Sequence, residues 1–292
     1  MQGVNGQTIG NLTHATNQEN NRINPRPAET PQVENRNSKV KKSIKCLNTN
    51  AQSLQYKIEE LSEKMKTNEV QIASVTESWG QEWKESTLEI KGYNMYKKHR
   101  EDGRRGGGCV IYVSKELKSY TCSQMRNVQG DDSVWCWVKL NDRTRILVGC
   151  IYRSPNCSNN NNELIMNQIM KASEVAGENR MLLMGDFNVK EIDWTEDAVN
   201  GSENYFPFRF NECIKDCFLY QHVQIPTRYK GTQPESLLDL VFTKEEQDVK
   251  NIQLAALLRK SDHCVIIWEF ICVRMPVNSF IPKRLYHKAD LN

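Results

Sequence analysis

Short apolar runs bounded by polar or turn-forming residues recur along the chain from residue 43 onward, and this pattern limits the possible folds most strongly. Runs of this kind predict strands over 43–48, 70–75, 93–98, 108–113, 134–140, 145–152, 181–184, 237–242 and 264–270. Apolar residues at helical spacing predict helices over 54–65, 164–176 and 208–218. Strands outnumber helices and several are joined as hairpins, so the sequence predicts a layered α+β protein with antiparallel or mixed sheets.

The chain falls into three segments of different composition. Residues 1–42 are rich in Asn, Gln, Thr and Pro and lack hydrophobic periodicity, which is typical of a disordered tail. Residues 43–271 contain all of the predicted strands and helices, and the pattern fades over 272–292, where we expect a linker-like segment. A chain of 292 residues therefore has room for one large domain with a tail at each end.

Cysteine usage and the lack of long apolar runs indicate where such a protein works. Ten cysteines are present without a Cys-x-x-Cys pair, and several lie inside strand-like runs, which favours buried free thiols over a disulfide framework. We see no signal peptide ahead of them and expect a reducing compartment, nuclear or cytoplasmic, without secretion. No apolar run approaches the ~20 residues that span a bilayer, so we expect no membrane partner.

Basic residues are concentrated in two clusters. The net charge is only +3, which permits nucleic-acid binding without arguing strongly for it. One cluster lies at 39–45, and the second spans 97–105 and includes Arg100, Arg104 and Arg105. A phosphate backbone responds to such local clusters more than to the total charge. On charge alone, two solvated loops explain the clusters equally well.

Acidic and amide side chains stand at the ends of three predicted strands. Glu77 follows the run 70–75, Gly185-Asp186-Phe187-Asn188 follows 181–184, and Ser261-Asp262-His263 precedes 264–270. A rigid scaffold can aim side chains at strand ends into one shared site. Taken singly, each of these residues is more commonly a solvated loop residue or a capping residue than a catalytic one. Their ordered combination is the stronger signal.

This ordered set of motifs resembles the endonuclease/exonuclease/phosphatase superfamily, which includes apurinic endonucleases, deoxyribonuclease I and inositol-phosphate phosphatases. The resemblance covers residues 43–270. Four further motifs are similar to the endonuclease modules of jockey- and chicken-repeat-type non-LTR retrotransposons: Leu47-Asn48-Thr49-Asn50-Ala51, Glu77-Ser78-Trp79, Arg105-Gly106-Gly107-Gly108-Cys109-Val110-Ile111-Tyr112 and Ile151-Tyr152-Arg153-Ser154-Pro155. We see no polymerase and expect an isolated endonuclease module, either a fragment or a host-adopted copy.

The resemblance implies a four-layered α/β-sandwich, in which two mostly antiparallel sheets pack face to face between helices, with the site at one end of the sheets. Phosphodiester hydrolysis needs a metal to neutralise phosphate charge, an activated water and a donor to the transition state. Oxygen ligands suit Mg²⁺, or Mn²⁺ in its place, and we expect no small-molecule cofactor. The expected metal ligands are Glu77 and Asn48, with Asp262 on the metal side.

Five residues are expected to carry the chemistry. Asp186 orients and deprotonates the attacking water, and Asn188 hydrogen-bonds the phosphate. His263 donates to the phosphoryl oxygen, preferably as imidazolium. Asp239 resembles the family carboxylate that orients this histidine, and such a partner raises a histidine pKa. Tyr152 is a second phosphate donor.

The expected partner is double-stranded DNA, and the expected product is a nick made by a monomeric enzyme. Thr227 resembles a threonine that contacts the DNA backbone in related modules. Arg228, Arg100, Arg104 and Arg105 are expected to hold the backbone, and such contacts position DNA without reading its sequence.

Several alternatives stay open at this point. In apurinic endonucleases the position two residues after the first Asn is acidic, whereas Asn48 is followed by Asn50 here. The two amides share one face of an extended strand, so either can be the working one. The other functions that fit are a phosphomonoesterase or inositol-phosphate phosphatase on the same scaffold, a catalytically dead, domesticated DNA-binding or interaction module, and an inert fragment of a decayed element.

Overall fold

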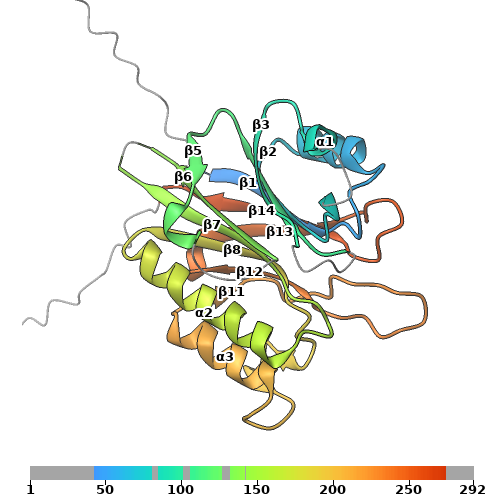
Figure 1. The fold of residues 1–292 in the computed structure, drawn as a ribbon, viewed down its shortest axis with the longest axis vertical. Coiled ribbons are helices and arrows are strands. Elements are labelled where there is room, and N and C mark those ends of the chain that lie inside the picture. The colour runs from blue at the N-terminus through green and yellow to red at the C-terminus, as the bar shows by residue number, and fades with distance from the viewer. Residues whose placement is uncertain (1–42, 81–84, 101–105, 127–131, 142, 274–292) are drawn as a thin grey trace, which may run out of the picture. The chain divides into compact units, whose positions relative to one another are not determined.

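The computed structural model describes residues 43–80, 85–100, 106–126, 132–141 and 143–273 (Figure 1). The expected polar tail at 1–42, most of the expected linker at 272–292, and Arg104 and Arg105 lie outside these ranges. In the described part of the chain, no helix combines the length and the apolar character that a membrane span requires.

The first sheet has the strand order β13-β14-β1-β2-β4-β3. Its members are β1 (Ser43–Asn50), β2 (Val70–Thr76), β3 (Tyr93–Lys98), β4 (Cys109–Ser114), β13 (Val249–Ala255) and β14 (Val265–Ile271). Strands β1 and β2 pair in parallel, and all other neighbours pair antiparallel. A parallel pair needs a crossover, and α1 (Ile58–Thr67) provides it.

The second sheet has the order β11-β12-β8-β7-β6-β5. Its members are β5 (Ser119–Thr121), β6 (Ser133–Lys139), β7 (Arg145–Tyr152), β8 (Arg180–Asp186), β11 (Tyr220–Gln221) and β12 (Asp239–Thr243). Here β7 and β8 are the parallel pair, joined through α2 (Asn159–Ala176). Between β8 and β11 the chain forms a small hairpin, β9 (Ile192–Asp193) with β10 (Ala198–Val199), and the helix α3 (Phe206–Asp216).

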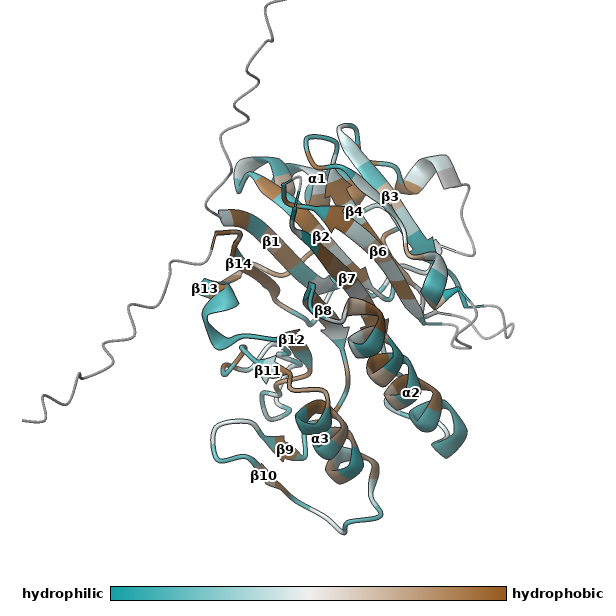
Figure 2. Cartoon of the chain, turned by 90° about the vertical axis from the view of Figure 1, so that its left-hand side faces the viewer, coloured by the Kyte–Doolittle hydropathy of each residue, from teal (hydrophilic) through white to brown (hydrophobic). Residues whose placement is uncertain are grey.

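The elements stack in four layers, which confirms the expected fold class. The sheets face one another through an apolar layer that includes Ile72, Val148 and Trp268. Helix α1 covers the outer face of the first sheet, and α2 and α3 cover that of the second (Figure 1). Figure 2 shows the corresponding colouring, with mostly apolar strands in the middle and helices that carry both polar and apolar residues.

Each predicted strand is present to within two residues at either end, whereas the helix starts differ more. Helix α2 begins at Asn159 because Ser158 caps it, its Oγ accepting from the Asn161 backbone nitrogen, and the polar first turn hides this start from a hydrophobic pattern. Helix α1 begins only at Ile58, since the buried Leu54 belongs to the preceding loop. Strand β13 was not predicted, because as an edge strand it keeps polar, exposed residues.

Candidate active site

Five chain segments deliver polar side chains to one end of the two sheets. Asn50 ends β1, Glu77 follows β2, and Asp186 ends β8, while Asp239 begins β12 and His263 lies just ahead of β14. The strands β12 and β14 begin at this end because they run antiparallel to β8 and β1. Pairing of β12 with β8 therefore places Asp239 directly opposite Asp186. The packing of β1 against β8 brings the residues of the first sheet close to this pair.

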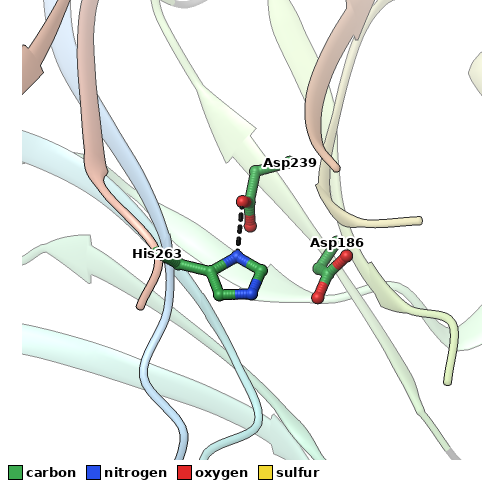
Figure 3. A group of neighbouring side chains, drawn as sticks. All are labelled: Asp186, Asp239 and His263. Atoms are coloured by element: carbon green, nitrogen blue, oxygen red, sulfur yellow. Dashed lines mark hydrogen bonds and ion pairs between the residues drawn. The ribbon is translucent and has the colours of Figure 1, made fainter. Parts of the chain in front are cut away.

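His263 is held from one side by a carboxylate. Its Nδ1 lies 2.7 Å from Asp239 Oδ2, and Figure 3 shows the ring between Asp239 and Asp186. Thr227 Oγ1 donates to the same Asp239 oxygen at 2.8 Å. Burial by itself lowers the pKa of His263, but the Asp239 charge and hydrogen bond outweigh it and raise the pKa to about 9. The imidazole is therefore charged at neutral pH and can donate through Nε2.

Asp186 has an unusually basic carboxylate. Burial, followed by the charge of Asp239, raises the pKa of Asp186 to about 7, against the lowering effect of His263 and of the Asn50 hydrogen bond. The Asp239 Oδ1 atom is buried and has no hydrogen-bond partner among the described residues, so its charge is poorly compensated on that side. A carboxylate with a pKa near the working pH is suited to accept a proton from water.

Asn50 links the two acidic sides of the site. Its Nδ2 donates to Glu77 Oε1 at 2.9 Å and to Asp186 Oδ2 at 2.7 Å. Glu77 is partly exposed, and its other oxygen accepts from Trp79 Nε1 at 3.3 Å. Burial raises the pKa of Tyr152 far above its ordinary value, as do the charges of Glu77 and Asp186 and a hydrogen bond to Glu77. The neutral hydroxyl of Tyr152 thus lies beside Glu77 as a hydrogen-bond donor.

The turn after β8 is built to present Asp186. A Cβ at Gly185 would lie 1.8 Å from the carbonyl oxygen of Ile151, so only glycine fits against β7 there. Asn188 adopts a positive φ of 50°, and its Nδ2 donates to the Arg153 carbonyl at 2.8 Å. The buried Arg153 guanidinium returns a bond of 3.0 Å to the Asn188 carbonyl.

The acidic end of the site fits a hard divalent cation. Asp186, Asp239 and His263 have potential ligand atoms within 4.8 Å of one another. However, the short Nδ1 contact already pairs His263 with Asp239, and a charged imidazolium cannot ligate a metal. Glu77 is the better anchor, because it is partly exposed and its partners Asn50 and Trp79 are neutral donors. Carboxylate and water ligands of this kind suit Mg²⁺.

The sequence left open whether Asn48 or Asn50 is the amide of the active site. The structure places Asn50 among the catalytic groups and Asn48 away from them. Asn48 Oδ1 accepts from Ser74 Oγ at 2.6 Å in the layer between the sheets. The Asn48 side chain is completely buried, and its Nδ2 has no partner among the described residues. The assignment of Asn48 as a metal ligand is therefore corrected. Asn50 contacts the Glu77 carboxylate, whereas Asn48 lies two residues earlier on the same face of β1 and so farther from that carboxylate.

Two residues assigned to DNA binding are buried against internal partners instead. Arg100 is only 6% exposed and binds Asp132 through Nε at 3.0 Å and Nη2 at 2.5 Å. Thr227 is completely buried and bonded to Asp239. Both assignments are corrected, because a buried group that already has a protein partner does not present itself to a phosphate backbone. Arg104 and Arg105 lie outside the described residues.

Asp262 and Arg228 lie at the rim and bind each other. Arg228 Nε and Nη2 each lie 3.1 Å from Asp262 Oδ2. Asp262 Oδ1 is 3.5 Å from His263 Nε2. Arg228 remains 27% exposed and Asp262 16%, so both stay accessible beside the site.

Sequence reasoning missed two residues that hold this site together. Arg153 fixes the turn after β8 by donating to the carbonyls of Phe187 and Asn188. The sequence motif contains Arg153 but predicts no role for it. Gln52 bonds both Asn50 and Asp262. A lone Gln in a loop carries no local signal, although its position two residues after Asn50 would have indicated it once Asn50 was known to be the working amide.

Comparisons with known proteins agree with this arrangement. The sequence profile of a family described as endonuclease-reverse transcriptase matches residues 146–267. No curated protein matches the chain.

Solved structures match over most of the chain. The endonuclease domain of TRAS1, a telomere-specific non-LTR retrotransposon, has a TM-score of 0.63 at 16% identity, with 80% of this chain and 100% of that one covered. The AP endonuclease of Leishmania major has a TM-score of 0.63 at 12% identity, with 79% and 88% covered. The 3'-5' exonuclease of Neisseria meningitidis has 0.59 at 13%, with 78% and 100% covered. The chain therefore has the endonuclease/exonuclease/phosphatase fold, and its residues 146–267 match the profile of the endonuclease-reverse transcriptase family.

Proposed function

We propose that this chain is a Mg²⁺-dependent endonuclease of the non-LTR retrotransposon type, which hydrolyses one phosphodiester bond and so nicks double-stranded DNA. One observation carries the proposal: the same end of the sheets holds the carboxylate of Glu77, the basic carboxylate of Asp186 and the charged imidazole of His263. These are the three groups that metal-assisted phosphodiester hydrolysis needs. The nucleases that share the fold support the same reading.

Each group has a distinct task in the proposed reaction. Asp186 accepts the proton of the attacking water, since its raised pKa makes it a stronger base than an ordinary aspartate. His263 donates from Nε2 to a phosphoryl oxygen, because Asp239 engages its Nδ1. Asn188 has a second amide hydrogen that supplies a further hydrogen bond to the phosphate, and the Tyr152 hydroxyl supplies one when it turns from Glu77 to the substrate. A divalent cation at Glu77, Mg²⁺ or Mn²⁺, would neutralise phosphate charge.

The structure offers basic residues near the site for the DNA backbone. Arg259 and Lys260 are exposed and lie directly ahead of Ser261. We propose that Arg259, Lys260 and the partly exposed Arg228 contact the phosphates, and that the buried Arg100 does not. Such contacts hold the duplex over the site and weaken as salt rises.

The proposal is tested by incubating the full chain with supercoiled plasmid in the presence of Mg²⁺ or EDTA. We expect open-circular product only with Mg²⁺, and a rate at least about 100-fold lower in His263→Asn. His222→Asn is the matched control, because His222 lies beside Thr243 and bonds it, away from the catalytic groups. It should nick at nearly the wild-type rate.

Two other results would replace the proposal with an alternative. Release of inorganic phosphate from an inositol phosphate by the same folded protein, without nicking, would identify a phosphomonoesterase. Binding of DNA without turnover of either substrate would identify a catalytically dead binding module.

A further inference from the structure

Asp262 has both carboxylate oxygens bound by other side chains. Gln52 Nε2 donates to Asp262 Oδ1 at 2.7 Å, and the Asp262 backbone nitrogen donates back to Gln52 Oε1 at 3.2 Å. Arg228 binds the second oxygen, Oδ2, through two nitrogens at 3.1 Å. The three residues therefore form one closed set of contacts, which we call the clasp.

The clasp joins three loops that are distant in sequence. Gln52 lies in the loop after β1, Arg228 in the loop before β12, and Asp262 in the loop before β14. Main-chain bonds reinforce it, since the Tyr229 nitrogen donates to the Asp262 carbonyl at 2.8 Å. Gln52 itself adopts a positive φ of 43°. A non-glycine residue is rarely held in that conformation, which is typical of positions where the surroundings override a local preference.

The clasp reaches two of the working residues. The Gln52 backbone nitrogen donates to Asn50 Oδ1 at 3.0 Å, which turns the Asn50 nitrogen toward Glu77 and Asp186. Ser261, next to Asp262, donates from Oγ to the Asn50 carbonyl at 2.8 Å and accepts from the His263 nitrogen at 3.1 Å. Gln52 and Asp262 thus act through Asn50 and His263 as positioning residues.

We propose that the clasp keeps Asp262 out of the metal site, so that the protein binds a single divalent cation at Glu77. The Arg228 guanidinium already neutralises the Asp262 carboxylate at contact distance. A second dication placed there would be repelled by this guanidinium. It would also face the amide hydrogens of Gln52, which cannot serve as metal ligands. An acidic residue at position 52 would offer ligand oxygens instead.

The inference rests on the proposed function, and its test counts bound ions without relying on turnover. Free Mn²⁺ is measured by electron paramagnetic resonance during titration of the full chain. We expect one Mn²⁺ per wild-type chain. Asp262→Asn keeps an oxygen that accepts from Gln52 but removes the negative charge. The Mn²⁺ affinity of this variant should change by less than about threefold, because the lost charge is near the metal site but screened from it. Glu77→Gln should lower the affinity at least about tenfold.

A second arm changes the clasp itself. Gln52→Glu replaces the donor to Asp262 by an acceptor, so two carboxylates face each other and a second, weaker Mn²⁺ should appear. Amide hydrogen exchange at Tyr229 and Cys264, which bond across these loops, should become at least about tenfold faster. Gln55→Glu, the same change three residues along the same loop, is the control and should alter neither readout.

The outcomes separate this inference from the proposed function. Two Mn²⁺ ions in the wild type, or loss of one ion in Asp262→Asn, would overturn the inference. Unchanged exchange in Gln52→Glu would overturn the positioning role. A folded wild type that binds no Mn²⁺ would overturn both the single-cation site and the metal-dependent function. One bound ion without nicking would overturn the function alone.

Discussion

His263, Asp239 and Thr227 form a chain of hydrogen bonds in the interior, with exposed fractions of 3%, 0% and 0%. Burying such groups costs free energy unless each finds a partner. Asp239 Oδ2 meets that need for both neighbours, accepting from His263 and from Thr227. A buried charged pair with a strongly shifted histidine pKa is typical of a catalytic site, where the charge serves the reaction.

Asp239→Asn should separate the orienting role of this carboxylate from mere packing. The change removes the negative charge that raises the His263 pKa, so that pKa should fall and less imidazolium should remain at pH 8. We expect kcat to drop by about 10² to 10⁴ and the alkaline limb of the pH–rate profile to move to lower pH. Plasmid nicking rates measured from pH 6 to pH 10 test this.

Asp193→Asn is the control for Asp239→Asn, since Asp193 is exposed and lies in the β9–β10 hairpin. It should leave the pH–rate profile in place. An alkaline limb that stays at the same pH in Asp239→Asn would mean that another group sets the protonation of His263.

At the scale of elements, the parallel pair β7–β8 sets the position of Asp186. Tyr152 and Asp186 are register partners at the end of this pair, and Ile151 stands opposite Gly185. The backbones approach closely there, because Gly185 has no Cβ and a φ of +149°. The close approach lets β8 turn away from the sheet directly after the strand.

Gly185→Ala should destabilise the protein strongly. The new Cβ would overlap the Ile151 carbonyl, a backbone atom that cannot move without opening the β7–β8 pair. We expect a loss of several kcal/mol in the free energy of unfolding, on the order of 3 to 5. Urea denaturation followed by circular dichroism measures it. Gly231→Ala is the control, since Gly231 also has a positive φ but no atom within 4 Å of the added Cβ, and a comparable loss there would refute the steric explanation.

His222, at the end of the short strand β11, should contribute to acid sensitivity. Its Nε2 lies 2.6 Å from Thr243 Oγ1, which donates its hydrogen to the Glu245 carbonyl, so the imidazole acts as donor in the neutral form. Burial lowers the pKa of His222 to about 4, below its ordinary value of 6.5. As the pH falls from 6.5 toward 4, the unfolded chain binds a proton at this residue and the folded protein does not.

The stability contributed by neutral His222 is therefore complete above pH 6.5 and is lost as the pH falls toward 4. The loss should reach at most about 3 kcal/mol. Other groups titrate in the same range, so the measured quantity is the difference in unfolding free energy between the wild type and His222→Gln from pH 7 to pH 4. A difference that stays constant over this range would contradict the prediction.

At the scale of the whole molecule, a buried ion pair joins the two sheets. Arg180 begins β8 in the second sheet, and its guanidinium binds Asp248 at 2.6 Å and lies 4.2 Å from the ring centre of Phe270 in the first sheet. Another nitrogen of the same guanidinium donates to the Cys272 carbonyl at 3.2 Å. The pair lies in the interior, with Arg180 7% and Asp248 0% exposed.

Arg180→Met should destabilise the protein by about 3 to 5 kcal/mol, because it removes the guanidinium that neutralises the buried Asp248 carboxylate. The double variant Arg180→Met/Asp248→Leu should recover most of this loss, since apolar residues of similar size replace both charges. Urea denaturation of the wild type and both variants tests the pair. The exposed pair Arg209–Glu163 is the comparison, and Arg209→Met should leave the denaturation midpoint nearly unchanged. A double variant no more stable than Arg180→Met would contradict the charge argument.

The sequence predicted those parts of the site whose signal is local. Asp186 follows a glycine at the end of an apolar run and His263 precedes another run, so their positions at strand ends could be inferred from periodicity alone. The assignments of Arg100 and Thr227 were wrong for a common reason. Charge or motif likeness does not show whether a residue meets an internal partner, and Asp132 and Asp239 provide one here.

The sequence by itself determined the succession of strands and helices, the superfamily it resembles and the order of the catalytic motifs, because these follow from patterns of adjacent residues. Only the tertiary structure decided between Asn48 and Asn50, since both share a strand face and depth between the sheets distinguishes them. It also revealed the bond between Gln52 and Asp262, which lie 210 residues apart. Such contacts depend on how the sheets pack and pair, and no local pattern encodes that geometry.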